Sequence, residues 1–309
     1  MKVLLTGGRG MVGRNVREAA GAAAHEVLAP GRDELNLFDG AAVDAYLARH
    51  KPDLIIHAAG RVGGIAANIK NPVAFLVENL DIGRNVILGA ARAGVPRLIN
   101  LSSSCMYPRD AENPLREAQV LTGTLEPTNE GYAIAKIAAM KLCRYITTEN
   151  PALAYKTLIP CNIYGRHDHF DLERGHLVAA VITKLDQARR DGAAEIDIWG
   201  AGTARREFMY AGDLADAIWR AAESYDGLPE VMNVGVGDDH SVNDYYQTIA
   251  EVVGFTGRFT HDLTKPAGMA RKLMDVSGMK AWGYTPATSL KEGLAQTYRY
   301  YLDEVLQAA

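Results

Sequence analysis

The chain has 309 residues, of which 48% are hydrophobic and 23% are charged, and its formal net charge at pH 7 is −4. This length and composition are typical of a globular protein of one large or two smaller lobes, and the acidic balance argues against a nucleic-acid partner, which would need a basic face. No apolar run approaches the roughly 18 residues of a membrane span, and the three cysteines form neither a paired framework nor a metal-binding spacing. We therefore expect no membrane, no bound metal and a cytoplasmic location.

A short apolar strand is predicted at residues 2–6, and a glycine-rich turn and a helical run follow it. The glycines recur as Gly-x-x-Gly-x-x-Gly, a variant of the dinucleotide-binding pattern, in which the backbone turns sharply and approaches a pyrophosphate at a helix N-terminus. The alternative is a tight structural turn that binds no ligand. The residues of this turn that we expect to contact a cofactor are Gly7, Arg9, Gly10, Met11, Val12 and Gly13.

The second predicted strand covers residues 25–29. In dinucleotide-binding folds, a residue at the end of this strand contacts the ribose that carries the extra phosphate in NADP and a hydroxyl group in NAD. An acidic residue there would bind the ribose of NAD. Here Arg32 follows, and together with Arg9 it could bind the extra phosphate of NADP through charge-assisted hydrogen bonds. We favour NADP, although the acidic residues 33–34 leave a solvated loop as the alternative. Asp39 is expected either at the adenine edge or in a structural turn.

The third predicted strand, residues 53–57, runs into Ala58 and Ala59. Their small side chains would let a cofactor lie against the backbone at the strand end, so both are expected cofactor contacts. His57 is expected to be a packed histidine at the end of the strand rather than a catalyst.

Strands and helices alternate along the first half of the chain, with a helix at 72–93, a fourth strand at 97–101, a helix at 131–150 and a fifth strand at 155–160. Such alternation predicts an α/β fold of Rossmann type, a doubly wound parallel sheet with helices on both faces. We expect this dinucleotide-binding domain to span 1–165, with segments near 206–235 returning to it. A smaller, mostly C-terminal α/β substrate lobe is expected from 166–205 and 236–309.

The stretch from Ser103 to Lys136 carries the chemistry that we expect. Tyr132 and Lys136 are four residues apart on a predicted helix and so share one face. An ammonium group there would lower the pKa of the phenol and make it a proton donor or acceptor near neutral pH. Ser103 could hydrogen-bond the same substrate oxygen, and Cys105 supplies a thiol, which reacts only where its surroundings favour the thiolate. The stretch is therefore expected to bind and activate a carbonyl group.

With these motifs in view, the chain resembles the extended short-chain dehydrogenase/reductase family almost from end to end. The segments that carry the resemblance are GGRGMVG at 7–13, RDELNLFD at 32–39, VGGIAAN at 62–68, SSCMYP at 103–108, GTLEPTNEGYAIAK at 123–136, WGAGTARREF at 199–208 and RKLMD at 271–275. The Tyr-x-x-x-Lys spacing alone is a weak signal, whereas the SSCMYP segment followed by the whole approach to the helix is specific.

The resemblance implies a reaction in two parts on GDP-4-keto-6-deoxy-D-mannose. Carbons 3 and 5 would be epimerised, and NADPH would then reduce the 4-ketone to give GDP-L-fucose. In this scheme Tyr132, Lys136 and Ser103 act at the ketone oxygen, Cys105 is the base and His176 the opposing acid. Without the resemblance, His176 would be interpreted as a helix cap or a surface residue, and Cys105 as a small buried hydrophobic residue.

The resemblance also implies further contacts. For the cofactor these include Tyr132, Lys136, Asn162 and His176, and for the substrate they are Asn162, Lys184, Trp199, Arg206 and Lys272. Lys184 stands where an arginine is expected, which leaves its role open, and Arg206 could instead be ordinary surface charge. Relatives in the family imply a homodimer joined through the helices at 72–93 and 131–150. The alternatives are another nucleotide-sugar 4-keto reductase or epimerase of the same family, or a non-catalytic NADP-binding regulatory protein.

Overall fold

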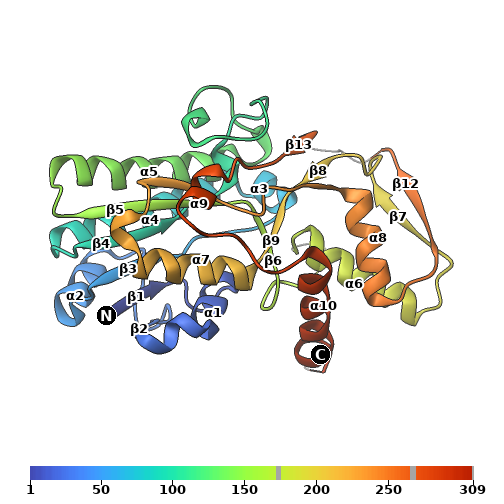
Figure 1. Ribbon diagram of the computed structural model, residues 1–309, viewed down its shortest axis with the longest axis horizontal. Helices are drawn as coiled ribbons and strands as arrows, with labels where there is room; N and C mark the ends of the chain where they lie inside the picture. The colour runs from blue at the N-terminus through green and yellow to red at the C-terminus, as the bar shows by residue number, and fades with distance from the viewer. Residues whose placement is uncertain (172–174, 265–268, 308–309) are drawn as a thin grey trace.

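The computed structural model describes residues 1–171, 175–264 and 269–307. At its centre is a six-stranded parallel sheet in the order β10-β5-β4-β3-β1-β2 (Figure 1). The strands are β1 Lys2–Thr6, β2 Glu26–Leu28, β3 Leu54–His57, β4 Arg97–Leu101, β5 Ala154–Pro160 and β10 Val231–Val234. The predicted Rossmann-type sheet is thus confirmed. Because the order reverses between β1 and β3, the ends of these two strands border the crevice in which such sheets bind ligands.

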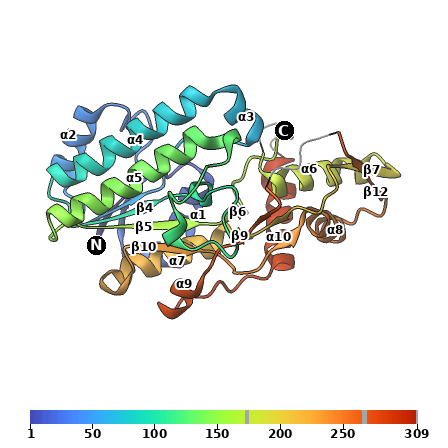
Figure 2. The same cartoon turned by 90° about the horizontal axis from the view of Figure 1, so that it is seen from above.

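Helices cover both faces of the sheet, as Figure 2 shows. The helices are α1 Met11–Glu18 and α7 Ala211–Glu223 on one face, and α2 Gly40–His50, α4 Pro72–Arg92 and α5 Glu130–Glu149 on the other. Adjacent residues of β1 face opposite ways: Leu5 packs with the α7 side, and Leu4 packs with the α4 side. Burial of both faces explains why the strands are almost continuously apolar.

A second body lies beside the sheet, at the right of Figure 1, and has its own apolar core, which includes Ile182, Leu185, Ile198, Ile249 and Leu294. Its elements are α6 Leu177–Arg190, β7 Glu195–Trp199, β8 Arg205–Arg206, β11 His240–Ser241, α8 Val242–Val253, β12 Arg258–Asp262, β13 Arg271–Lys272 and α10 Leu290–Tyr300. The pair β6 Asn162–Tyr164 and β9 Phe208–Tyr210 lies between the two bodies, and α3 Ile65–Lys70 and α9 Ser277–Ala281 are short. Within the described ranges, every helix is too short or too polar to span a bilayer.

One buried carboxyl group, that of Glu207, fastens three segments together where the two bodies meet. Its Oε1 accepts hydrogen bonds from the backbone N–H groups of Val236 (2.6 Å) and Gly237 (2.8 Å), and its Oε2 accepts one from Met274 (2.7 Å). The side chain is fully buried, and burial raises its pKa to about 7, although the three hydrogen bonds act in the opposite direction.

This carboxyl group predicts a specific pH dependence of stability. Because its pKa is higher in the folded protein than the usual 4.5, its contribution to the free energy of unfolding is fully present below about pH 4.5 and is lost as the pH rises through about 7. Between pH 5 and pH 8 we expect the free energy of unfolding of the wild-type protein to fall by an amount on the order of 2–3 kcal/mol on account of this group. Glu207→Gln should abolish this decrease. Urea unfolding of both proteins at the two pH values measures the difference. The exposed Glu149→Gln should keep the wild-type dependence, and an unchanged dependence in Glu207→Gln would contradict the assignment.

Candidate active site

The glycine-rich turn after β1 fits against the end of β3. Gly7 has φ +76°, and a Cβ atom on it would lie 2.7 Å from the backbone nitrogen of Ala59. A Cβ on Gly13 would lie 2.2 Å from the carbonyl oxygen of Gly7, so only glycine fits at either position. Gly10, at the N-cap of α1, has no side chain to cap the helix, so the N–H groups of the first turn remain available for an anion. This geometry fits the pyrophosphate of a dinucleotide.

The remaining residues predicted for this part of the site are placed close to the turn. Ala58 and Ala59 directly follow β3, and Met11 and Val12 are the first two residues of α1. His57 is buried and shares a hydrogen bond of 2.8 Å with Thr6, and burial lowers its pKa to about 3. It is therefore a neutral, packed histidine, as the sequence predicts.

The two arginines expected at the NADP phosphate have separate partners. Arg9 Nη1 lies 3.2 Å from Asp33 Oδ1, and the guanidinium carbon of Arg32 lies 5.0 Å from the ring centre of Phe38. Both are exposed. Arg9 also lines a hollow of about 460 Å³, and the other lining residues are Arg14, Arg17 and Glu18. The sequence analysis did not single out Arg14 and Arg17, although their spacing of three on the helix that follows the turn places them on one face.

Asp39 has the structural role that the sequence left open. Its Oδ1 accepts hydrogen bonds from the backbone N–H groups of Ala41 (2.9 Å) and Ala42 (3.1 Å), and it is the N-cap of α2. A capping carboxylate of this kind stabilises a helix by about 1 kcal/mol.

Four predicted residues come together at the carboxyl end of β4. Ser103 follows that strand, its Oγ accepts a hydrogen bond from the backbone N–H of Cys105 (3.2 Å), and its side chain also hydrogen-bonds Tyr132. Lys136 Nζ donates to the carbonyl oxygen of Leu101 (3.0 Å) and lies 5.8 Å from the ring centre of Tyr132. The helical spacing of four therefore does bring the amine and the phenol together.

The protonation expected for this pair needs correction. We expected the ammonium group of Lys136 to lower the pKa of Tyr132. Instead, burial raises the pKa of Tyr132 well above its usual value, the charge of Cys105 acts in the same direction, and the hydrogen bond to Ser103 only offsets part of it. Burial also lowers the pKa of Lys136 to about 8. Removal of the phenol from water outweighs the neighbouring charge, so Tyr132 is neutral and serves as a proton donor.

The sulfur of Cys105 has two further neighbours. Asn129 Nδ2 lies 3.2 Å from Sγ, and Lys272 Nζ lies 3.7 Å from it. Lys272 pairs in register with Arg206 on the parallel strands β13 and β8, so both substrate-binding candidates are placed on the same side of the cluster. Arg206 donates to the carbonyl oxygen of Arg205 (2.7 Å). The sequence analysis missed Asn129, whose only signal was an amide residue immediately before the helix.

His176 stands at the N-cap position of α6, and its imidazole pairs with a buried carboxylate. Its Nδ1 lies 3.3 Å from Oδ1 of Asp168, which also accepts a hydrogen bond of 2.8 Å from the backbone N–H of His169. The hydrogen bond to Asp168 raises the pKa of His176, while burial acts against it. The described contacts of His176 join it to Asp168 and not to Cys105 or Tyr132. The sequence carries no signal of this partnership.

The remaining substrate candidates lie farther along the second body. Asn162 Nδ2 donates to the carbonyl oxygen of Glu207 (2.9 Å). The ammonium group of Lys184 is bound to Asp197, at 2.8 Å from Oδ1 and 2.6 Å from the carbonyl oxygen. Trp199, the last residue of β7, is 61% exposed. Lys184 thus has a partner within the protein.

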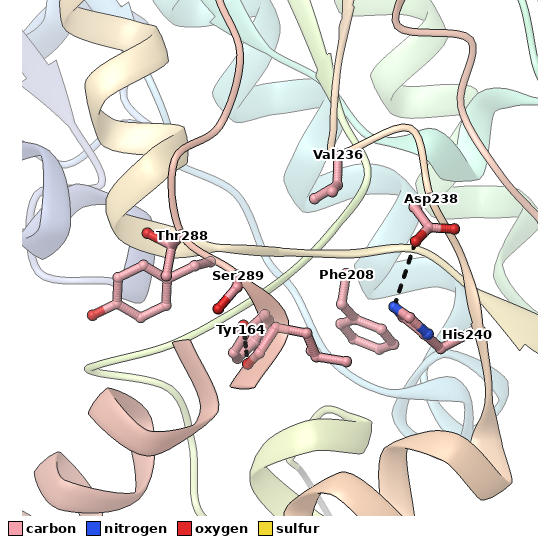
Figure 3. Close-up of a pocket in the computed structure, with 9 residues that line it drawn as sticks. Tyr164, Phe208, Val236, Asp238, His240, Thr288 and Ser289 are labelled. Carbon is pink, nitrogen blue, oxygen red and sulfur yellow. Dashed lines mark hydrogen bonds and ion pairs between the residues drawn. The ribbon is translucent and has the colours of Figure 1, made fainter. Parts of the chain in front are cut away.

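A separate hollow of about 220 Å³ lies beside the β6–β9 pair and is drawn in Figure 3. It is lined by Tyr164, Phe208, Tyr210, Val236, Asp238, His240, Thr288, Ser289 and Leu290. Asp238 and His240 form an ion pair of 3.8 Å at its edge when the imidazole is protonated. None of the residues predicted from the sequence is among those that line it.

Comparison with known proteins gives consistent results. Residues 3–235 match the model of the NAD dependent epimerase/dehydratase family. The chain is 47% identical over 304 residues to GDP-L-colitose synthase of Yersinia pseudotuberculosis, which covers 98% of this chain and 99% of that protein. It is 49% identical over 301 residues to GDP-L-fucose synthase of Azorhizobium caulinodans, with 97% and 96% covered. Among solved structures, a GDP-mannoheptose C4 reductase from Campylobacter jejuni with NADP bound superposes with a TM-score of 0.87 at 27% identity, over 97% of this chain and 98% of that one.

Proposed function

Because the chain belongs to the NAD dependent epimerase/dehydratase family, we propose that it converts GDP-4-keto-6-deoxy-D-mannose into GDP-L-fucose. It is an NADP-dependent oxidoreductase and epimerase. The observation that carries this proposal is the cluster of Ser103, Cys105, Tyr132 and Lys136 at the carboxyl end of β4. The relative named GDP-L-fucose synthase, 49% identical over 301 residues, supports the choice of sugar.

The first part of the reaction inverts the two carbons beside the ketone. Loss of a proton from either carbon sends the electron pair to the ketone oxygen, where the neutral hydroxyl of Tyr132 and the hydroxyl of Ser103 stabilise the resulting enolate. Inversion needs a base on one face of the sugar and an acid on the other. In our proposal Cys105 takes the proton as a thiolate, and His176, whose pKa Asp168 raises, returns one to the opposite face.

The second part reduces the ketone. The turn from Gly7 to Gly13 would hold NADPH, which would supply the hydride. Tyr132 gives its proton to the ketone oxygen, and the ammonium group of Lys136, 5.8 Å from the ring centre, stabilises the phenolate that remains. A phenol with a raised pKa is suited to this step because it holds its proton until an oxyanion begins to form.

The diphosphate of the substrate is proposed to lie along β8 and β13. Arg206 would bind it, since an arginine fork is well suited to a diphosphate. Lys272, in register beside Arg206 on β13, would lie between the diphosphate and the sulfur of Cys105, which is 3.7 Å from its Nζ. Trp199 would then stack on the nucleotide base, since its side chain is largely exposed at the end of β7. Lys184 would act through Asp197, to which it is bound, rather than directly on a phosphate.

Removal of one arginine should change cofactor preference. We expect Arg32→Ala to weaken the binding of NADPH by about tenfold or more and to leave NADH unchanged, because a charge-assisted hydrogen bond to the extra phosphate contributes roughly 1.5–3 kcal/mol. Fluorescence titration with each nucleotide measures both dissociation constants. Arg84→Ala, an exposed arginine on α4, is the matched control. A parallel loss of affinity for both nucleotides would contradict a role at the phosphate.

We also propose that two lobes, 1–165 with 206–235 and 166–205 with 236–309, close on the substrate, and that two chains form a homodimer. Apolar side chains are exposed along α3, α4 and α5, which lie together in Figure 2. They are Ile65, Ile69, Val73, Val77, Ile134 and Tyr145. A face of this kind is typical of a buried interface. The three cysteines are free thiols, in keeping with a reducing cytoplasm.

The dimer has a direct test. We expect Val73→Glu combined with Val77→Glu to convert the protein from dimer to monomer in light scattering, because each charge would be buried without a partner. Leu263→Glu, at a similarly exposed apolar residue of the second body, should leave the mass unchanged. A wild-type monomer, or a double variant that stays dimeric, would contradict the interface.

The proposed reaction is tested with purified protein, NADPH and GDP-4-keto-6-deoxy-D-mannose in heavy water. The expected product is GDP-L-fucose with deuterium at carbons 3 and 5, identified by NMR and mass spectrometry. Absence of deuterium at either carbon would contradict the double epimerisation. Tight binding of NADPH without turnover would instead favour a non-catalytic regulatory protein.

A second candidate is the formation of GDP-L-colitose, whose sugar lacks the 3-hydroxyl group of fucose. It is favoured by the relative of that name, which is 47% identical over 304 residues. The assay is repeated with the 3-deoxy form of the keto sugar. A value of kcat/KM for the 3-deoxy sugar that exceeds that for the 3-hydroxy sugar tenfold or more would replace the first candidate by the second.

A further inference from the structure

Asn129 stands at the N-cap of the helix that carries Tyr132, but it does not cap that helix. Asparagine at this position usually accepts a hydrogen bond from the first turn and stabilises the helix by about 1 kcal/mol. Here no such bond is made, and Nδ2 instead points to Cys105 Sγ at 3.2 Å. The Oδ1 atom is buried without a hydrogen-bond partner. Asn129 therefore contacts the sulfur of Cys105 in place of the usual hydrogen bond to the first turn of the helix, which indicates a role at the sulfur.

Lys272 approaches the same sulfur from the other body. Its side chain is buried, and Nζ lies 3.7 Å from Sγ. Within the described residues, its ammonium group has no carboxylate at ion-pair distance. The backbone beside it is fixed, because Leu273 N–H donates to Asn113 (2.8 Å) and Met274 N–H to Glu207 (2.7 Å). A buried ammonium group is unfavourable unless an anion compensates its charge, and the sulfur is the acceptor that it meets.

We propose that Asn129 and Lys272 form a two-donor cradle that holds the sulfur of Cys105 as a thiolate, ready to take a proton from the sugar. The sulfur of a thiol is only a weak acceptor, whereas a thiolate is a strong one and is also attracted by the charge of Lys272. Both are positioning residues, and their use in epimerisation rests on the proposed function. In that step the thiolate forms an S–H bond, the C–H bond of the sugar breaks, and its electron pair moves to the ketone oxygen.

Two ionisable groups of α5 also belong to this cluster. The charge of Cys105 helps to raise the pKa of the Tyr132 hydroxyl, so that group stays neutral. Lys136 Nζ donates to the carbonyl oxygen of Leu101 (3.0 Å). Lys272 is therefore the cation that the cradle brings within 4 Å of the sulfur.

The cradle is tested on the free enzyme by the rate of alkylation with iodoacetamide as a function of pH. Cys143 and Cys161 are buried, so the reaction reports on Cys105, and Cys105→Ser provides the blank. We expect Lys272→Met to slow alkylation at pH 7 by about tenfold, because the thiolate is the form that reacts and the variant removes the cation beside it. Lys272→Arg should keep most of the wild-type rate. Lys291→Met, an exposed lysine paired with Glu251, is the matched control.

Variants of Asn129 provide a second, independent test, in which a negative charge is added instead of a positive charge being removed. Asn129→Asp places a carboxylate beside the sulfur and should slow alkylation more than Asn129→Ala does. Wild-type profiles in both Lys272→Met and Asn129→Asp, with circular dichroism showing that both are folded, would overturn the proposal. Because alkylation needs no substrate, a shifted profile in a protein that does not epimerise the keto sugar would refute the function and leave the cradle standing.

Discussion

Replacement of Tyr132 by phenylalanine is expected to slow both epimerisation and reduction by at least about a hundredfold. The same hydroxyl stabilises the enolate in the first part and donates its proton in the second, so neither step can proceed normally without it. In the proposed reaction, its place beside Ser103 and Lys136 lets it act on the ketone oxygen. Loss of a donor to a developing oxyanion commonly costs roughly 2.7–4 kcal/mol, which agrees with this magnitude.

Two assays separate the effects on the two steps. Incorporation of deuterium from heavy water measures epimerisation, and loss of NADPH absorbance with an already epimerised keto sugar measures reduction. Tyr145→Phe, on the same helix but exposed, is the matched control and should retain both activities. A Tyr132→Phe protein that lost one activity and kept the other would show that the two steps use different acids.

Replacement of Cys105 by serine should have the opposite selectivity. We expect exchange of the protons at carbons 3 and 5 to fall by about a thousandfold or more, because a hydroxyl group ionises far less readily than a thiol and makes a poor base near neutral pH. Hydride transfer to the already epimerised sugar should change by less than about threefold, since Tyr132 and Lys136 are untouched. The difference between the two effects identifies the sulfur as a base.

The matched control for this variant is Cys143→Ala, a buried cysteine of α5 that packs between the sheet and its helices. It should lower stability and leave both steps intact. Equal damage to exchange and to hydride transfer by Cys105→Ser would remove the assignment of the sulfur as base and leave it a role in shaping the site.

The sequence predicted those features that depend on local spacing. Tyr132 and Lys136 share a helix face because four residues make about one turn. The glycine at position 7 precedes a helix, and in the structure its positive φ and its contact with Ala59 explain why glycine is needed there. The doubly wound parallel sheet followed from the alternation of apolar strands and helices, although the order of its strands was not predicted. Each of these features depends on the pattern of residues that are near one another in the sequence.

Features that depend on tertiary contact were missed or misjudged. The raised pKa of Tyr132 results from burial under distant segments, which spacing along a helix does not reveal. Lys272 meets Cys105 across 167 positions of chain. The partnership of Asp168 with His176 and that of Lys184 with Asp197 join residues 8 and 13 positions apart through loop and strand geometry. A lone carboxylate or amine in a sequence carries no signal of such a partner.

The electrostatic link between Cys105 and Tyr132 has a consequence for timing. A negative charge on the sulfur acts together with burial to raise the pKa of the phenol. In the proposed reaction, the proton that the sulfur takes from the sugar would neutralise that charge. Tyr132 would then be the stronger acid when the ketone oxygen needs its proton, so inversion would favour the reduction that follows.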